Sequence, residues 1–273
     1  MEIRRNSRLM EYLESLAFHI VDSGFARVGT DWNMERVRSP YTRLYYALEG
    51  EGLLCHAGGE TRLTPGCVCL IPSQFLYDCR CEGVFGHLYF HVNLVAADGH
   101  DLLGLMQTCP VADLGTASVE ALLHAYRGET VADALRLWQA IHAQLAAFLA
   151  DSAVGTAPCE TPSAFLEQVY SLARRSVSAQ MTVASLAEQM AVSPGALSRR
   201  FRAETGGTPA RYLDGLLLQR AQQLLLSSDE PIGRIADVLG FCDQFYFSRW
   251  FRQHRQETPS AYRLRLREPY PNG

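Results

Sequence analysis

Residues 193–212 read SPGALSRRFRAETGGTPARY, and residues 243–262 read DQFYFSRWFRQHRQETPSAY. The two stretches match position by position at an offset of 50 residues, and each is preceded by an apolar-Ala pair, Leu186-Ala187 and Ile235-Ala236. A fixed offset over so many positions indicates an internal repeat. The matched pairs are Arg199 and Arg249, Phe201 and Phe251, Pro209 and Pro259, and Tyr212 and Tyr262.

Each copy reads as two short helices joined by a tight turn. In the first copy, Ser193 is placed to cap the second helix and Pro194 suits the first position of that helix. In the second copy, Gly240 is placed to end the first helix and Asp243 to cap the next one. This pattern is typical of a helix-turn-helix, whose second helix enters the major groove of DNA.

A single predicted helix, Pro209–Leu226, separates the two copies. At 1.5 Å per residue this helix is roughly 25–30 Å long. Recognition helices that read successive major grooves lie about 34 Å apart, which is one turn of B-DNA. The spacer therefore lets one chain read two successive grooves on one face of the duplex.

The side chains predicted to contact DNA lie near the start of each second helix. Gln pairs with adenine, Arg pairs with guanine, and Phe contacts the thymine methyl group. The first recognition helix begins with Pro-Gly-Ala, so Ser198 and Arg199 are expected to carry its readout and the second copy to specify more. A surface ion pair is the alternative role for Arg199 and Arg249. The predicted DNA-binding residues are Gly195, Ser198, Arg199, Arg202 (to phosphate), Gln244, Phe245, Arg249 and Arg252 (to phosphate).

The repeat carries a family pattern. Its residues are Leu186-Ala187, Ser193, Leu197–Phe201, Gly206 and Thr208-Pro209 in the first copy, and Ile235-Ala236, Gly240-Phe241, Tyr246–Arg249, Phe251-Arg252, Thr258-Pro259 and Tyr262-Arg263 in the second. With this pattern the C-terminal part resembles the DNA-binding region of AraC-type bacterial transcription regulators. The resemblance implies an all-α domain of seven helices, promoter DNA and RNA polymerase as partners, and activation rather than repression. Gln256 departs from the pattern, because the family has Gly at this helix end; a local cost of about 1 kcal/mol is expected.

Charge is distributed unevenly along the 273 residues, whose net charge is −4. Residues 1–160 hold 11 Arg and 19 acidic side chains, a net −8, whereas residues 161–273 hold 14 Arg and 10 acidic side chains, a net +4. The basic part is the part expected to face nucleic acid. The chain has no run of 18 apolar residues, so we predict neither a membrane span nor a membrane partner. The first residues do not form a secretory signal, so we expect a cytoplasmic protein.

The N-terminal part changes its pattern along the chain. Apolar residues at helical spacing predict a leading helix over Asn6–Gly24. From about residue 26 to 95, short apolar runs between Gly and Pro turns predict a cupin-like β-barrel, and two helices follow at about 118–151. The fold class is therefore α+β multidomain. The predicted parts are a ligand and dimerisation domain over residues 1–151, a linker over residues 152–162 and a double helix-turn-helix domain over residues 163–273.

The turns of this barrel also carry a resemblance. Its runs are Leu48–Gly52, Leu63–Gly66, Leu70–Pro72 and His87–Phe90. They resemble the cupin-like ligand domain of AraC-type regulators. Resemblance to the sugar-responsive members places His87 and Tyr89 on a pocket-lining strand, and Arg43 and Tyr45 on another. An Arg fork beside aromatic faces suits a sugar or a carboxylate. Packing in the core is the alternative role for these side chains.

The barrel lacks the residues of a metalloenzyme. Cupin enzymes have His-x-His and Glu after the first glycine turn, whereas residues 53–58 read LLCHAG. No nucleophile–base pair can be picked out either. We therefore predict no enzyme activity, no cofactor and no metal, and a ligand-responsive, DNA-binding transcription regulator whose effector is a sugar or related small metabolite. The alternatives are a cupin-type metalloenzyme fused to a DNA-binding module and an effector-free DNA-binding protein.

Four cysteines and one helix leave alternatives open. Alternate residues of a strand share a face, so Cys67, Cys69, Cys79 and Cys81 on neighbouring strands can bind zinc, or they can pack as small apolar side chains. The helix near residues 130–151 is expected to pack on the barrel or against a second copy, since this region mediates dimerisation in AraC-type regulators. Its apolar stripe is Leu135, Trp138, Ile141, His142, Leu145, Phe148 and Leu149.

Overall fold

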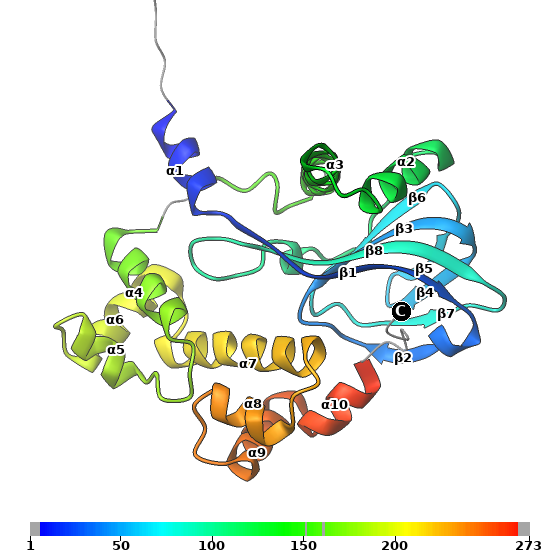
Figure 1. Ribbon diagram of the computed structural model, residues 1–273. Helices are drawn as coiled ribbons and strands as arrows, with labels where there is room; N and C mark the ends of the chain where they lie inside the picture. Colours follow the sequence, from blue (N-terminus) through cyan, green and yellow to red (C-terminus); the bar gives the residue numbers. More distant parts are fainter. Residues whose placement is uncertain (1–5, 151, 160–161, 267–273) are drawn as a thin grey trace, which may run out of the picture. The chain divides into compact units, whose positions relative to one another are not determined.

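The computed structural model describes residues 6–150, 152–159 and 162–266 (Figure 1). The remaining residues of the predicted domains and linker, which are 1–5, 151, 160–161 and 267–273, lie outside the described residues. The chain divides into two compact units, and each is considered by itself. The first is rich in β-strands and the second is helical. The predicted domain boundaries remain predictions.

Two antiparallel sheets form the β-rich unit. Within the described residues, the larger sheet has the strand order β1-β8-β3-β6-β9 and the smaller has the order β2-β7-β4-β5. Successive strands alternate between the sheets at most steps, which is the arrangement of a double-sheet jelly roll. The predicted β-rich fold is confirmed. The strands are β1 (Ala17–Val28), β2 (Met34–Val37), β3 (Thr42–Gly50), β4 (Gly52–His56), β5 (Gly59–Leu63), β6 (Cys67–Ile71), β7 (Tyr77–Arg80), β8 (Phe85–Val95) and β9 (Val111–Asp113).

The first strand corrects one expectation. Instead of a helix over Asn6–Gly24, helix α1 spans Ser7–Ser15 and β1 begins at Ala17. Strand β1 pairs with β8 along its whole length, from Ala17 opposite Val95 to Val28 opposite Phe85. The hydrogen bonds of this long pairing outweigh the weak helical spacing of residues 17–24, because tertiary context overrides local propensity.

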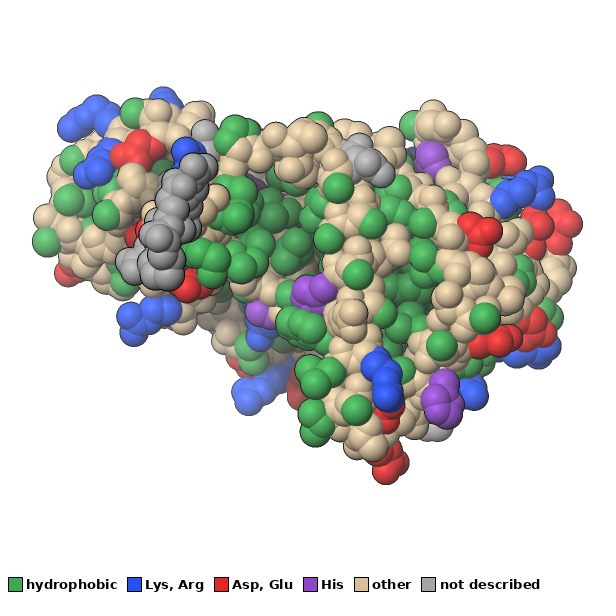
Figure 2. Space-filling model, turned by 90° about the horizontal axis from the view of Figure 1, so that it is seen from above, with side chains coloured by type: hydrophobic (Ala, Val, Ile, Leu, Met, Phe, Trp, Pro, Cys, Tyr) green, Lys and Arg blue, Asp and Glu red, His purple; other side chains and the backbone are tan. Residues whose placement is uncertain are grey.

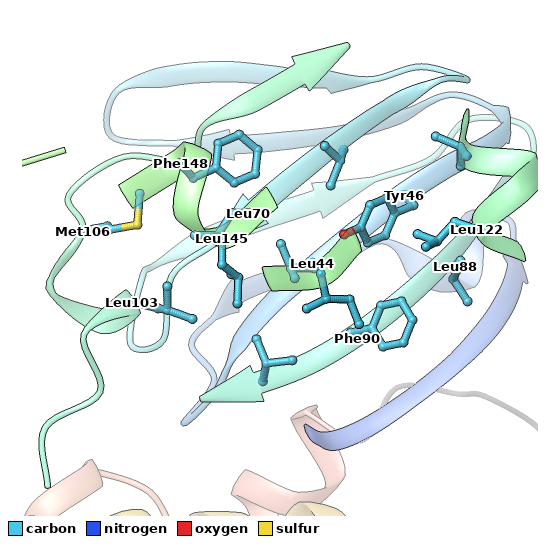
Figure 3. Close-up of a cluster of buried hydrophobic side chains, with 14 residues drawn as sticks. Leu44, Tyr46, Leu70, Leu88, Phe90, Leu103, Met106, Leu122, Leu145 and Phe148 are labelled. Carbon is cyan, nitrogen blue, oxygen red and sulfur yellow. The ribbon is translucent and has the colours of Figure 1, made fainter. Parts of the chain in front are cut away.

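Two helices cover one face of the larger sheet: α2 (Thr116–Tyr126) and α3 (Val131–Ala150). Side chains alternate across a strand, so Leu44 and Tyr46 of β3 and Leu88 and Phe90 of β8 face these helices together. They form a buried cluster with α2 and α3, to which α3 contributes Leu145 among others (Figure 3). The odd-numbered residues of β3 and β8 therefore face the other way, into the space between the sheets.

The helical unit includes α1 and, within the described C-terminal residues, the seven helices that were predicted there. Its first core cluster joins α4, α5, α6 and α7, and includes Val169, Leu186 and Phe201. No helix among the described residues is long and apolar enough to cross a lipid bilayer. The helices are α4 (Ala164–Arg175), α5 (Val183–Gln189), α6 (Pro194–Thr205), α7 (Pro209–Ser227), α8 (Ile232–Val238), α9 (Gln244–Arg255) and α10 (Pro259–Leu266). Two 3-10 turns, η1 (Thr30–Trp32) and η2 (Leu103–Leu105), lie in the β-rich unit.

Candidate nucleic-acid interface and ligand site

Helices α5 and α6 form the first helix-turn-helix. The Ser193 side chain accepts a hydrogen bond from the Ala196 backbone N–H at 3.2 Å, so the predicted cap is formed. Leu197 and Phe201 are buried and fix which face of α6 remains outside. The turn between the helices passes through Ala191, whose φ is 53°. An L-residue in this left-handed region costs roughly 1 kcal/mol or more.

Helices α8 and α9 form the second motif in the same way. Gly240 ends the first helix with φ 76°, and the Asp243 carboxylate accepts a hydrogen bond from the Tyr246 backbone N–H at 2.7 Å. Phe247 is fully buried, as its counterpart Leu197 is. At the far end of α9, Gln256 has φ 62°, which confirms the expected positive φ at this helix end.

Helix α7 connects the two motifs and ends one residue beyond the predicted Leu226. Its 19 residues make a rod of about 28 Å. Near its start, the Tyr212 ring lies 5.7 Å from the Phe201 ring of α6. Near its end, the Leu225 carbonyl accepts a hydrogen bond from Arg263 Nε of α10 at 3.0 Å. Helix α6 of the first motif is thus attached near the start of α7, and α10, which follows the second motif, is attached near its end (Figure 1).

The predicted phosphate and base contacts lie mostly on the surface. Arg199 and Arg202 of α6 and Arg249 and Arg252 of α9 are all exposed. Within the described residues none of the four makes an ion pair, so the alternative role as surface salt bridges is not met there. Arg200, by contrast, is held by Glu204 at 2.8 Å and lies over the Phe165 ring at 4.2 Å.

The other four predicted DNA-binding residues differ in exposure. Phe245 is 72% exposed, an unusual position for a large apolar side chain, and Gln244 and Gly195 are exposed beside the helix starts. Ser198 is half-buried, so it offers less reach than the Arg that follows it. Sequence reasoning missed Tyr246, which is 48% exposed with the Arg249 guanidinium 6.0 Å from its ring centre. Its position directly after Phe245 is the only sequence signal.

The four predicted ligand residues share one face of the larger sheet. Strand register places Tyr45 directly opposite Tyr89, and His87 opposite Ala47 on the same strand pair. Arg43 is 1% exposed; its Nε donates to Ser39 Oγ at 3.0 Å, and its Nη1 donates to the Tyr45 hydroxyl at 2.7 Å. The structure therefore brings all four together between the sheets.

The charge of the two buried histidines follows from this location. Burial, followed by the nearby Arg43 charge, lowers the pKa of His87 to about 3. The same two causes hold the pKa of His91 well below its ordinary value. Asp22 Oδ2 lies 3.6 Å from His91 Nδ1, but the buried imidazole is neutral at pH 7, so we do not regard this contact as an ion pair.

Comparison with known proteins identifies the chain. Residues 186–265, which span both motifs, match a protein family described as a helix-turn-helix domain. The chain is 28% identical to the MmsAB operon regulatory protein of Pseudomonas aeruginosa, over 94% of this chain and 88% of that protein. It is 37% identical to the HTH-type transcriptional activator RhaR of Pectobacterium carotovorum, over 37% of this chain and 36% of that protein. The C-terminal part of the chain carries the duplicated helix-turn-helix of AraC-type transcription regulators.

The fold agrees with that family. A crystal structure of ToxT from Vibrio cholerae matches 92% of this chain and 99% of its own, with a TM-score of 0.51 and 10% identity. The likeness in fold includes the β-rich unit. The protein binds DNA through its duplicated motif, and the relatives named above are transcription regulators.

Further buried side chains lie beside the four predicted ligand residues, and sequence reasoning missed them. Trp32 of η1 lies with its ring 6.1 Å from Tyr45 and 5.9 Å from His87, and the Tyr41 ring stacks on His91 at 4.4 Å. We call Trp32, Tyr41, Arg43, Tyr45, His87, Tyr89 and His91 the inner cluster. The only sequence signal for Trp32 was its position between two predicted strands. The strand register that brings these residues together cannot be derived from the local sequence pattern.

Three of the four cysteines lie on two different sheets of the regulator, and Cys81 directly follows β7. Cys67 and Cys69 belong to β6 in the larger sheet, whereas Cys79 belongs to β7 in the smaller one. Cys79 Sγ donates to the Trp32 carbonyl at 3.0 Å, and burial raises the pKa of Cys69 well above its ordinary value. Among the described residues, no three His, Cys, Asp or Glu side chains are grouped to hold a metal ion. Packing accounts for these thiols.

Proposed function

We propose that this regulator reads two successive major grooves of promoter DNA, with α6 in one groove and α9 in the next. This proposal rests on the equivalent positions of Arg199 and Arg249. They occupy matched positions of the repeat, both are exposed, and neither makes an ion pair within the described residues. An exposed Arg at the start of a recognition helix suits bidentate contact with guanine.

The neighbouring side chains have complementary roles in this proposal. Gln244 pairs with adenine and Phe245 contacts a thymine methyl group, whereas Arg202 and Arg252 bind phosphates. In the first motif Gly195 brings no side chain to the bases and Ser198 is half-buried, so Arg199 carries most of the readout there. The second motif therefore specifies more base pairs than the first.

The test compares Arg249→Ala with Arg220→Ala, an exposed Arg on α7 outside the recognition helices. Fluorescence anisotropy measures binding of the full chain to a selected cognate duplex and to a scrambled one. Arg249→Ala should lose roughly 1–3 kcal/mol of preference for the cognate duplex. Equal weakening on both duplexes would remove Arg249 from base readout. Arg220→Ala should leave the preference intact.

The inner cluster supports an effector site in the same protein. Arg43, Tyr45, His87 and Tyr89 lie together between the sheets, where a barrel mouth commonly holds a small molecule. One ToxT structure of similar fold is described as bound to (E)-4-(8-methylnaphthalen-1-yl)but-3-enoic acid. We propose that the effector, a sugar or related small metabolite, binds these four residues and changes DNA binding. A compound of this kind should raise the melting temperature by mass action.

The exposed part of α3 supports a homodimer. Ile141, Leu145 and Phe148 are buried in the β-rich unit, whereas Leu135 and Trp138 of the predicted stripe remain 62% and 53% exposed. Hydrophobic side chains gather at the surface over this helix in the view from above (Figure 2). We propose that this exposed part of α3 packs against the same surface of a second copy, since a large apolar patch on a surface marks an interaction site.

The remaining roles follow from promoter binding. The protein acts in the cytoplasm, where bacterial promoters are found, and it contacts RNA polymerase to activate transcription rather than to repress it. It is not an enzyme in this proposal, because the inner cluster offers neither a nucleophile–base pair nor a metal-ligand set among the described residues. A reporter gene behind the cognate promoter tests activation directly, and lower expression with the protein than without it would assign repression instead.

A further inference from the structure

The second recognition helix is hydrogen-bonded to the connecting helix through one buried amide. Gln222 lies in the second half of α7 and is 2% exposed. Its amide oxygen accepts hydrogen bonds from Arg255 of α9, at 3.0 Å from Nε and 3.2 Å from Nη2, and from the Tyr262 hydroxyl of α10 at 3.0 Å. The opposite amide orientation would set N–H groups against these donors. Gln222 therefore connects α7 to two other helices.

Aromatic rings and a second hydrogen bond support this connection. The Arg255 guanidinium lies 5.5 Å from the centre of the Tyr262 ring, and that ring lies 5.3 Å from the buried Phe251 ring of α9. Arg263 donates to the Leu225 carbonyl, so α10 is also fixed to the end of α7. Hydrogen bonds prefer a narrow range of angles, so the network defines the direction of α9 as well as its distance from α7.

The first motif lacks the same polar groups. At the offset of 50 residues, the counterpart of Arg255 is Thr205, whose hydroxyl donates to the Phe201 carbonyl of its own helix at 2.8 Å. The counterpart of Tyr262 is Tyr212, whose buried hydroxyl has no hydrogen-bond partner within the described residues. The repeat therefore provides a matched comparison between a tyrosine that is hydrogen-bonded and one that is not.

Helix α6 is held differently from α9. In the described part of the chain, which includes all of α6 and α7, no side-chain hydrogen bond joins these two helices. Glu204 of α6 accepts a hydrogen bond from Ser163, the cap of α4, and α6 contacts α7 through apolar rings such as Phe201 and Tyr212. Apolar packing is non-directional. The direction of α9 on α7 is therefore defined more strictly than that of α6.

The connection lies at the end of α9 away from the predicted reading side chains. Arg255 follows the buried Phe251 by about 6 Å along the helix axis, and Gln244 precedes it by about 10 Å. When α9 pivots on its buried ring, a sideways shift at Arg255 is enlarged at the other end. Holding Arg255 in place therefore holds Phe245 and Arg249 in place.

We infer that Gln222 is a positioning residue for DNA recognition: through Arg255 it fixes the direction of α9, and with it the spacing at which two half-sites are accepted. This inference rests on the proposed reading of two successive grooves. A half-site at the wrong spacing is rejected because α9 cannot turn to follow it.

Hydrogen exchange of the full chain measures the connection without DNA. Gln222→Met replaces the amide by an apolar side chain of similar length, so backbone amides of residues 251–256 should exchange at least about fivefold faster. Gln222→Glu keeps an oxygen that accepts from Arg255 and should retain the wild-type rate. Amides of α6 should be unchanged in both variants, whereas a general loss of stability would speed exchange in both recognition helices.

The matched tyrosines supply the control. Tyr262→Phe removes a hydrogen bond to Gln222 and should speed exchange at the end of α9 about twofold or more. Tyr212→Phe removes a hydroxyl that has no partner within the described residues, so exchange in α6 should not rise.

DNA binding tests the consequence. Fluorescence anisotropy compares the duplex that the full chain selects from a random-sequence library with the same duplex carrying one base pair inserted between the half-sites. The insertion turns one half-site about 35° around the axis. Wild-type protein and Gln222→Glu should lose at least about tenfold in affinity on the inserted duplex, and Gln222→Met about threefold or less. Circular dichroism checks folding, and if Gln222→Met is not folded, Arg255→Met, at a half-buried position, takes its place.

The outcomes separate this inference from the proposed function. If the insertion weakens folded Gln222→Met as much as the wild-type protein, the inference is overturned and the reading of two grooves stands. If the wild-type protein tolerates the insertion, the reading of two grooves fails and hydrogen exchange decides. Unchanged exchange at the end of α9 in Gln222→Met then overturns the inference, and faster exchange confined to α9 supports Gln222 as the residue that positions this helix.

Discussion

At the scale of single residues, two residues of the described helix-turn-helix motifs occupy a backbone conformation that suits glycine. Ala191 in the first turn has φ 53°, whereas its counterpart in the second turn is Gly240, and Gln256 at the end of α9 has φ 62° where the end of α6 has Gly206. Each motif therefore has a glycine at one of these two positions and a residue with a strained backbone at the other. The strained residue lies in the turn of the first motif and at the helix end of the second. We expect Ala191→Gly and Gln256→Gly each to stabilise the helical unit by about 0.5–1 kcal/mol.

Chemical denaturation followed by circular dichroism measures this gain. Ala203→Gly, at an exposed position within α6, is the matched control, and it should destabilise by about 1 kcal/mol because glycine weakens a helix interior. A loss of stability in both turn variants would mean that the left-handed residues are not strained. Gly240→Ala should be costly for a further reason, since an added Cβ would clash with Ser178 Oγ.

The neutral state of His87 predicts a pH dependence of stability. Its pKa is about 3 in the folded protein, against an ordinary value of 6.5. Below pH 6.5 the unfolded chain binds a proton that the folded chain refuses, so stability present above pH 6.5 is lost as the pH falls towards 3. The contribution approaches 1.4 kcal/mol per pH unit well below pH 6.5. His91 acts in the same direction.

Urea denaturation of the full chain at pH 7.5, 5.5 and 4.5 tests this dependence. His87→Phe removes one titrating group and should reduce the slope of stability against pH by about 1 kcal/mol per unit below pH 5.5. Ala47→Gly, the cross-strand neighbour, changes packing without removing a titrating group, so it should shift the curve without changing its slope. An unchanged slope in His87→Phe would mean that the imidazole is not kept neutral.

The sequence predicted single residues well where their role is local. Ser193 and Asp243 are caps, and Gln256 has positive φ, because each depends on the chain within three or four residues of itself. It predicted Arg43, Tyr45, His87 and Tyr89 through resemblance, but not that Trp32 and Tyr41 join them. Those contacts depend on strand register and on a turn folding over the sheet, which have no local signature.

At the scale of secondary-structure elements, α7 was predicted correctly and β1 was not, again because one depends on local sequence and the other on distant contacts. Helix α7 was predicted to within one residue at its C-terminus, since Thr208 caps it and Pro209 suits its first turn. Strand β1 was predicted as part of a helix over Asn6–Gly24, because its partner β8 lies far away in the sequence. Elements whose boundaries are set locally can be predicted, and elements set by distant pairing cannot.

Helix α3 carries the prediction about assembly. Leu135→Glu places a charge on the exposed stripe and should raise the dimer dissociation constant at least about tenfold, because a buried unpaired charge costs several kcal/mol. Ala143→Glu lies on the same helix, is exposed, and is turned roughly 80° away from Leu135 and about 140° away from Trp138 at 100° per residue. Sedimentation velocity should find that variant dimeric. Equal dissociation of both variants would place the interface elsewhere.

At the scale of the whole molecule, the duplication made the function predictable. A repeat at a fixed offset predicts two equivalent units from sequence alone, whereas the pairing of strands into two sheets depends on contacts across the chain. Charge is segregated on the same scale, with −8 on residues 1–160 and +4 on residues 161–273. The acidic part limits nonspecific attraction to DNA, so binding should depend on a few Arg–phosphate contacts rather than on overall charge.

This segregation predicts how salt changes DNA binding. Each phosphate contact that is lost should lower the slope of log K against log salt by about 0.9, so Arg202→Ala and Arg252→Ala should each reduce it by that amount. Both variants should weaken cognate and scrambled duplexes alike, because phosphate contacts carry no sequence information. Anisotropy titrations between 50 and about 200 mM salt measure the slopes. If Arg252→Ala instead changed the preference for the cognate duplex and left the slope intact, it would be a base-reading residue, and the division of labour along α9 would have to be reversed.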